Sequence, residues 1–137
     1  MKTTTNATNL QYAVIEGISF GILDGVNSIL KVNNNFDKIF MVGGGSKSKF
    51  WIELLASLLN RKLSVCDQSE FGAALGVARL SMYVDKNIDT KENIIKEINV
   101  SKSFNPNQDK IDLLLKRYNI WRDIYSSNKK IASNLLA

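Results

Sequence analysis

Two short apolar runs that flank an amphipathic segment constrain this chain more than any other feature. Residues 38–42 and 63–66 have the length and apolar character of buried strands. Residues 46–59 carry apolar side chains at helical spacing, and Asn60 is a typical helix stop. A strand-helix-strand unit joins parallel neighbours, which are normally covered on both faces within a larger sheet. We therefore expect an α/β fold whose remaining strands lie elsewhere, in another molecule or in a longer protein.

A long helix is expected before this unit, over residues 10–31. Its apolar positions recur at helical spacing and predict one buried face, made of Leu10, Val14, Ile18, Ile22, Val26 and Ile29 or Leu30. Gly17, Gly21 and Gly25 form a second stripe in the same segment. Each glycine costs about 1 kcal/mol relative to alanine in a helix. Close approach of another backbone to this stripe would offset that cost.

Further helices are expected after the second strand. Asp67 and Glu70 have the spacing of an N-cap residue with a carboxylate three positions later, which favours a helix start over a catalytic pair. The small residues over 72–78 predict close packing of this helix against a sheet or a ligand. Residues 91–98 indicate a short helix, and residues 107–133 a terminal amphipathic helix.

Composition excludes several classes of protein and of mechanism. The 137 residues suit about one domain, and 45% hydrophobic with 23% charged residues is typical of a soluble globular chain. The net charge of +5 is spread without a run of five like charges, so we expect no nucleic-acid partner. With no histidine and only Cys66, a zinc cluster or a histidine-dependent mechanism is excluded, and we expect no metal ligands in this chain. No apolar run approaches about 20 residues, so we expect a cytoplasmic protein without a membrane partner.

The segment Gly43–Ser48 lies between the first expected strand and the next helix, where a glycine turn suits phosphate. Glycines let backbone approach a ligand, and the first N–H groups of a helix have no internal partner. The spacing is not that of a Walker loop. It approaches a dinucleotide fingerprint, with Gly43, Gly45 and Ser48 in the motif and Asp67 as the ribose carboxylate. A Rossmann-like domain that binds NAD or an adenosine ligand, and a non-catalytic interaction domain with a ligand-free turn, are the two alternatives.

Three segments in order resemble the carboxyl end of the FGGY carbohydrate kinases: residues 11–20, 43–51 and 72–79. The resemblance extends from about Asn6 to the end of the chain. It implies that residues 1–137 are a single partial domain. That domain would be the carboxyl-terminal part of an actin-like ATPase domain of the ribonuclease-H-like fold, with parallel strands flanked by helices.

The same resemblance implies a nucleotide site. Gly43, Gly44 and Gly45 would lie against the nucleotide, and Ser46 and Ser48 would hydrogen-bond it. The reaction implied is transfer of a phosphoryl group from ATP, with Mg²⁺, to a sugar of the ketopentose class. The catalytic aspartate, the sugar-binding residues and the phosphate hairpin of the family all precede this region. We therefore expect no catalytic residue here, weak nucleotide binding at best and no activity in isolation, while the exposed sheet edge would allow a homodimer.

Other side chains near the turn have ordinary structural interpretations. Trp51 and Phe50 are expected in the core rather than stacked on adenine. Lys47 and Lys49 are expected to be solvated rather than bound to phosphate. Glu16 is expected to be a structural carboxylate whose partner the sequence does not reveal.

Overall fold

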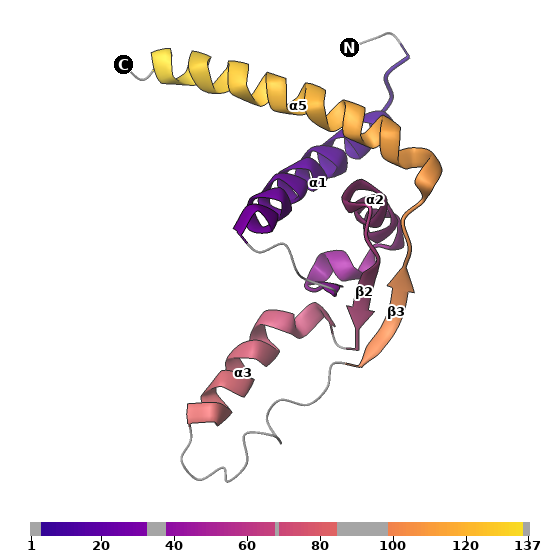
Figure 1. The fold of residues 1–137 in the computed structure, drawn as a ribbon, viewed down its shortest axis with the longest axis vertical. Helices are drawn as coiled ribbons and strands as arrows, with labels where there is room; N and C mark the ends of the chain where they lie inside the picture. The colour runs from indigo at the N-terminus through magenta and orange to yellow at the C-terminus, as the bar shows by residue number, and fades with distance from the viewer. Residues whose placement is uncertain (1–3, 33–37, 68, 85–98, 136–137) are drawn as a thin grey trace.

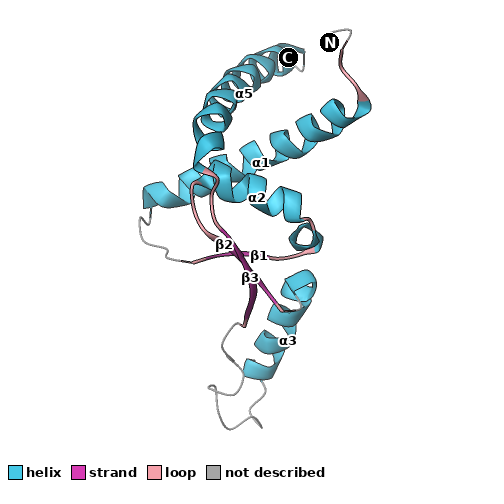
Figure 2. Ribbon diagram, turned by 90° about the vertical axis from the view of Figure 1, so that its right-hand side faces the viewer, coloured by secondary structure: helices cyan, strands magenta, loops and turns pink. Residues whose placement is uncertain are grey.

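The computed structural model describes residues 4–32, 38–67, 69–84 and 99–135 (Figure 1). Its elements are α1 (Ala7–Val32), β1 (Ile39–Met41), the 3-10 turn η1 (Gly44–Lys47), α2 (Lys49–Leu59), β2 (Leu63–Cys66), the 3-10 turn η2 (Ser69–Phe71), α3 (Gly72–Val84), β3 (Val100–Phe104) and α5 (Gln108–Leu135). The short helix expected over 91–98 lies outside the described residues. Helix α2 is central, because it packs on the sheet with one side and on α1 and α5 with the other (Figure 2).

The described sheet has three strands in the order β1-β2-β3. β1 and β2 are parallel, with Ile39 opposite Leu63 and Met41 opposite Val65, which confirms the expected strand pair. β3 is antiparallel to β2 and was not predicted from the sequence. Four of its five residues are exposed, so it lacks the apolar alternation that marks a half-buried strand. Its position leaves β1 at the other edge of the described sheet.

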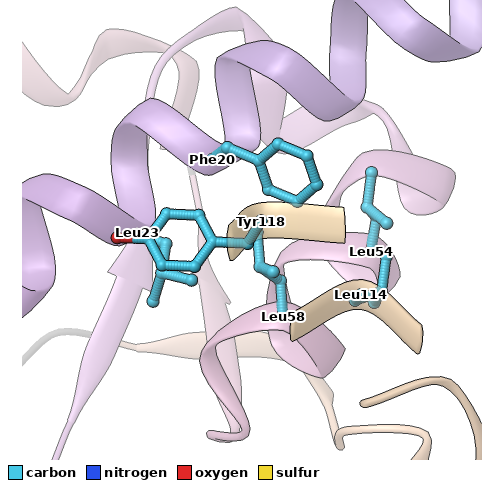
Figure 3. Packing of buried hydrophobic residues seen from close by; sticks show 6 residues of the cluster. All are labelled: Phe20, Leu23, Leu54, Leu58, Leu114 and Tyr118. Carbon is cyan, nitrogen blue, oxygen red and sulfur yellow. The ribbon is translucent and has the colours of Figure 1, made fainter. Parts of the chain in front are cut away.

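Helix α2 has a cap at each end and joins two apolar clusters. Ser48 is its N-cap and accepts a hydrogen bond from the amide of Trp51, while Asn60 ends it in the left-handed conformation with φ of 48°. Its sheet-facing side forms a cluster with the strands: Ile52, Leu55, Ala56, Leu63 and Val65. Its other side meets α1 and α5 in a second cluster, drawn in Figure 3: Phe20, Leu23, Leu54, Leu58, Leu114 and Tyr118.

Helix α1 buries the face opposite to the one predicted. Glu16, Ser19, Phe20 and Leu23 are its buried residues. The expected apolar stripe is exposed instead, with Leu10, Val14, Ile18, Ile22 and Ile29 between 36% and 63% accessible. The close approach expected at the glycine stripe is also not seen for two of its members, since nothing lies within 4 Å of an added Cβ at Gly21 or Gly25.

This two-sided character corrects a further expectation. By length and composition alone, α1 is apolar enough to cross a membrane, although no such segment was expected. Near its middle, however, the buried Glu16 carboxylate accepts a hydrogen bond from Arg117 of α5 at 2.7 Å. A helix that is apolar all round is typical of one enclosed by protein.

Helices α3 and α5 contribute unequally to the core. No residue of α3 is buried, and its contact with the sheet is at Gly72, where an added Cβ would lie 2.9 Å from Cβ of Val42. The tight packing expected over 72–78 is therefore limited to that first residue within the described chain. Helix α5 occupies the place of the expected terminal helix and buries Ile111, Leu114 and Tyr118.

Candidate functional site

The glycine turn after β1 is joined to the turn after β2. Gly43 has φ of 82° and ψ of −173°, a conformation that only glycine adopts readily. Its amide donates a 2.8 Å hydrogen bond to the carbonyl oxygen of Ser69. The two turns therefore meet at the carboxyl ends of the parallel strands, the edge at which open α/β sheets bind ligands.

Ser46 holds this junction closed from inside. It is buried, and its hydroxyl donates to the carbonyl oxygen of Gly43 at 2.7 Å. The same hydroxyl lies 2.7 Å from that of Ser69, which is also buried. Because a serine hydroxyl has one proton, the Ser46 proton is used within the turn and Ser69 supplies the second bond. The structure thus places Ser46, expected beside the nucleotide, in the support of the turn.

The start of the helix differs from the sequence prediction in a way that concerns Ser48. Residues 44–47 form the 3-10 turn η1, and α2 begins at Lys49 rather than at residue 46. Ser48 is half-buried and its oxygen accepts from the Trp51 amide at 3.3 Å. Within the described segments its own hydroxyl proton has no acceptor, so that proton can be donated to a ligand.

Gly44 and Gly45 are required for different reasons. An added Cβ at Gly45 would lie 2.6 Å from Cζ3 of Trp51 and 3.0 Å from Cε of Met41, so packing demands glycine there. Gly44 is exposed, and nothing lies within 4 Å of an added Cβ. Since the first N–H groups of a helical turn have no internal partner, and no loop bond is found for these two amides in the described chain, both amides are open donors. The turn is therefore a small site for an anion that backbone amides can bind.

Positive charge surrounds a cavity beside the turn. The cavity has a volume of about 390 Å³, and its lining includes Ser46, Ser69, Lys47, Lys49 and Lys102. Lys49 also forms an exposed ion pair with Glu53 at 3.7 Å. Lys102 and Ser69 were missed from the sequence, because Lys102 comes from the unpredicted strand β3 and Ser69 from the turn after β2. Three lysines near open amides favour an anionic ligand.

The structural interpretations of the aromatic and acidic residues are confirmed with one exception. The indole N–H of Trp51 donates to the Ser19 hydroxyl at 2.9 Å, and its ring packs against both apolar clusters. Glu16 is structural, with Arg117 as its partner. Phe50, expected in the core, is 50% exposed and touches the edge of Tyr12 instead.

The residues at the end of β2 show no sign of a catalytic pair. Asp67 is exposed, and its amide donates to the carbonyl oxygen of Asn99 at 3.1 Å, beside β3. Glu70 belongs to η2, so the expected helix begins at Gly72, after that turn. Burial, reinforced by the nearby Asp67 charge, raises the pKa of the Cys66 thiol, which keeps it protonated and unreactive.

Comparison with known proteins was made for sequence and structure. Residues 1–84 match the carboxyl-terminal domain of the FGGY family of carbohydrate kinases. A xylulose kinase from Staphylococcus epidermidis is 31% identical over 125 residues, which are 90% of this chain and 25% of that protein. A xylulose kinase from Escherichia coli is 23% identical over 116 residues, 85% of this chain and 24% of that protein.

Solved structures share the fold. A crystal structure described as a xyloylose kinase from Brucella ovis matches 96% of this chain and 27% of its own, with a TM-score of 0.80 and 24% identity. A gluconate kinase from Lactobacillus acidophilus matches 93% of this chain and 26% of its own, with a TM-score of 0.70 and 22% identity. The expected fold class, part of an actin-like ATPase domain, is confirmed by these likenesses. The chain spans about a quarter of the length of the relatives it matches.

Proposed function

This chain belongs to the FGGY family of carbohydrate kinases as its carboxyl-terminal domain, and from that premise we propose that it forms the nucleotide-side wall of the ATP cleft of a sugar kinase. The observation that carries the proposal is the turn after β1, where the amides of Gly44 and Gly45 are open at the carboxyl edge of the parallel strands. The sequence resemblance, which within the family is closest to xylulokinase, agrees with the relatives' names. We therefore assign the whole enzyme the reaction of ATP with D-xylulose to give ADP and D-xylulose 5-phosphate.

In this proposal the turn binds the nucleotide through its backbone. The amides of Gly44 and Gly45 donate to phosphate or ribose oxygens, and the Ser48 hydroxyl supplies a further donor. The bonds among Gly43, Ser46 and Ser69 hold the turn in its binding conformation before the ligand arrives. A site that is already ordered loses less entropy on binding.

The share of catalysis that falls to this chain is positioning. Phosphoryl transfer depends on alignment of the two substrates and on stabilisation of negative charge. The lysines around the cavity raise the local concentration of a polyphosphate and orient it, an effect that salt screens. The aspartate that accepts the sugar proton belongs to the upstream region of the family, so the isolated chain has no phosphotransferase activity.

The magnesium that accompanies ATP in this family is not assigned to residues here. Within the described residues, no three His, Cys, Asp or Glu side chains gather into a possible metal site. No step is therefore derived through the metal. The sugar is likewise chosen by the upstream region, since a gluconate kinase shares the fold of this wall. We place the intact enzyme in the cytoplasm, where both substrates occur.

A Rossmann-like NAD domain and a ligand-free interaction domain are separated from this proposal by one titration. Thermal unfolding of the chain is followed with ATP or NAD at millimolar concentration. A ligand at ten times its Kd stabilises a protein by about 1.4 kcal/mol, and we expect ATP to do so more strongly than NAD. Stabilisation by NAD alone, or by neither nucleotide, would refute the proposal.

A pair of glycine variants tests the contact itself. Gly44→Val adds a branched side chain over the open amides, so ATP should no longer stabilise the chain. Gly25→Val is the matched control, because both glycines are exposed with nothing within 4 Å of an added Cβ. Equal stabilisation of the two variants by ATP would show that the turn is not the site.

A further inference from the structure

The outer face of α1 is an apolar surface with nothing over it. Leu10, Val14, Ile18, Ile22 and Ile29 recur along this face, and each is at least 36% exposed. The opposite face of the same helix supplies Phe20 and Leu23 to the core. Large apolar side chains on both faces are typical of a helix between two layers of protein.

Two glycines make the outer face suitable for close contact. Gly21 and Gly25 fall between the exposed apolar residues at helical spacing, and an added Cβ at either position would meet nothing within 4 Å. Each glycine destabilises an exposed helix. That cost is recovered if the backbone of another element lies against these positions.

A second uncovered region adjoins the sheet. In the described sheet β1 has β2 as its one neighbour, so the N–H and C=O groups on its other edge are left unpaired. Helix α3 has no buried residue although it carries Leu75, Val77 and Leu80, all at least 37% exposed. Figure 1 shows α1 and α3 on the side of the strands away from β3, which is the side of this free edge.

We propose that the outer face of α1, the free edge of β1 and α3 form one docking surface, and that its occupant is the upstream part of an FGGY kinase. This inference rests on the family membership used above. The family region matched from residue 1 is the carboxyl-terminal domain, and this chain spans about a quarter of its relatives. The upstream three-quarters would therefore supply a strand beside β1 and apolar side chains over α1.

Other occupants fit the surface less well. A lipid bilayer could cover the apolar residues of α1, but it offers no hydrogen-bond partners to the edge of β1. A second copy of this chain has a free strand edge only of the same kind within its described part. A parallel strand pair is normally the interior of a larger sheet, and the upstream part of the kinase is the source of such strands.

A cleavable hybrid tests the docking. The matching quarter of the Staphylococcus epidermidis xylulose kinase is replaced by this chain, with a specific protease site at the junction. After purification and cleavage, gel filtration with light scattering measures whether the two parts remain together. We expect them to co-elute, and separation or aggregation of the hybrid would overturn the proposal.

Matched variants locate the surface. Ile18→Glu places a charge on the outer face of α1, and it should weaken the association of the cleaved parts on the order of 100-fold, because an unpaired charge is costly to bury. Gly21→Leu should weaken it as well. Ile124→Glu on α5 is the control, because Ile18 and Ile124 are 50% and 54% exposed, and it should leave the parts together. Circular dichroism of the variant chains alone should stay that of the parent.

The remaining outcomes also decide the question. Equal effects of Ile18→Glu and Ile124→Glu would overturn the proposal, as would dimers of this chain that Ile18→Glu abolishes. So would binding of the chain to vesicles of mixed neutral and anionic lipid. Gly44→Val should remove ATP binding from the hybrid without separating its parts, so failure of the nucleotide proposal is distinguishable from failure of docking.

Discussion

Substitution of Gly45 by alanine probes how tightly the glycine turn is supported. The new Cβ would lie 2.6 Å and 3.0 Å from two carbons of the Trp51 ring. This ring cannot give way easily, because its N–H donates to Ser19 and its faces contact both apolar clusters. Overpacking of this kind costs about 1–3 kcal/mol. Alanine also restricts the unfolded chain, which returns about 0.4–1 kcal/mol, so we expect Gly45→Ala to destabilise the chain by about 1–2 kcal/mol.

Gly44→Ala is the control for this prediction. Its Cβ would meet nothing within 4 Å, and its φ is not in the left-handed region. Only the effect on the unfolded chain remains, so stability should be unchanged or raised by up to about 1 kcal/mol. Urea unfolding followed by tryptophan fluorescence reports both midpoints, with an unchanged slope as the condition for comparison. The reasoning is refuted if Gly45→Ala is as stable as the parent, or if Gly44→Ala is the less stable of the two.

Two further predictions concern the contacts between α1 and α5. Arg117→Leu leaves the Glu16 carboxylate, 6% exposed and already without a partner at Oε1, unpaired in the core. We expect a loss of about 3 kcal/mol by thermal unfolding, whereas the exposed Lys116→Leu should cost little, and equal effects would count against the ion pair. Burial and a 2.7 Å hydrogen bond to Asp24 raise the pKa of Tyr118 above 10.0. The folded chain therefore keeps this proton more tightly than the unfolded chain, so the stabilisation is complete below about pH 10 and is lost as pH rises through the folded-state pKa. Tyr118→Phe should make stability fall less steeply in this alkaline range, and an unchanged slope would contradict the assignment.

The sequence predicts the strand-helix-strand unit well because each part has a clear local signal. Residues 38–42 and 63–66 are short apolar runs, and α2 has a capping serine and a terminal asparagine. Helix α1 shows the limit of this reasoning. Its apolar residues lie on both faces, so periodicity identifies a helix without deciding which face this chain covers. The exposed face is the one with the more regular spacing, and its partner lies outside the chain.

The parts of the site that escaped prediction depend on contacts distant in sequence. β3 reads as polar, and pairing with β2 rather than apolar alternation makes it a strand. Lys102 reaches the cavity only through that pairing. The role of Ser46 depends on Ser69, 23 residues later, because their hydroxyls meet at the junction of two turns. A local motif places a serine beside a glycine turn but does not show whether its hydroxyl faces inward.

The most direct test of the nucleotide wall is a titration of the ¹⁵N-labelled chain with ATP followed by NMR. The account predicts saturable shifts of the Gly44 and Gly45 amide signals, which are open in the structure. The Ser46 amide, bonded to Gly43 at 3.0 Å, should move much less. Shifts confined to other residues, or none at millimolar ATP, would contradict a backbone site for the nucleotide at this turn.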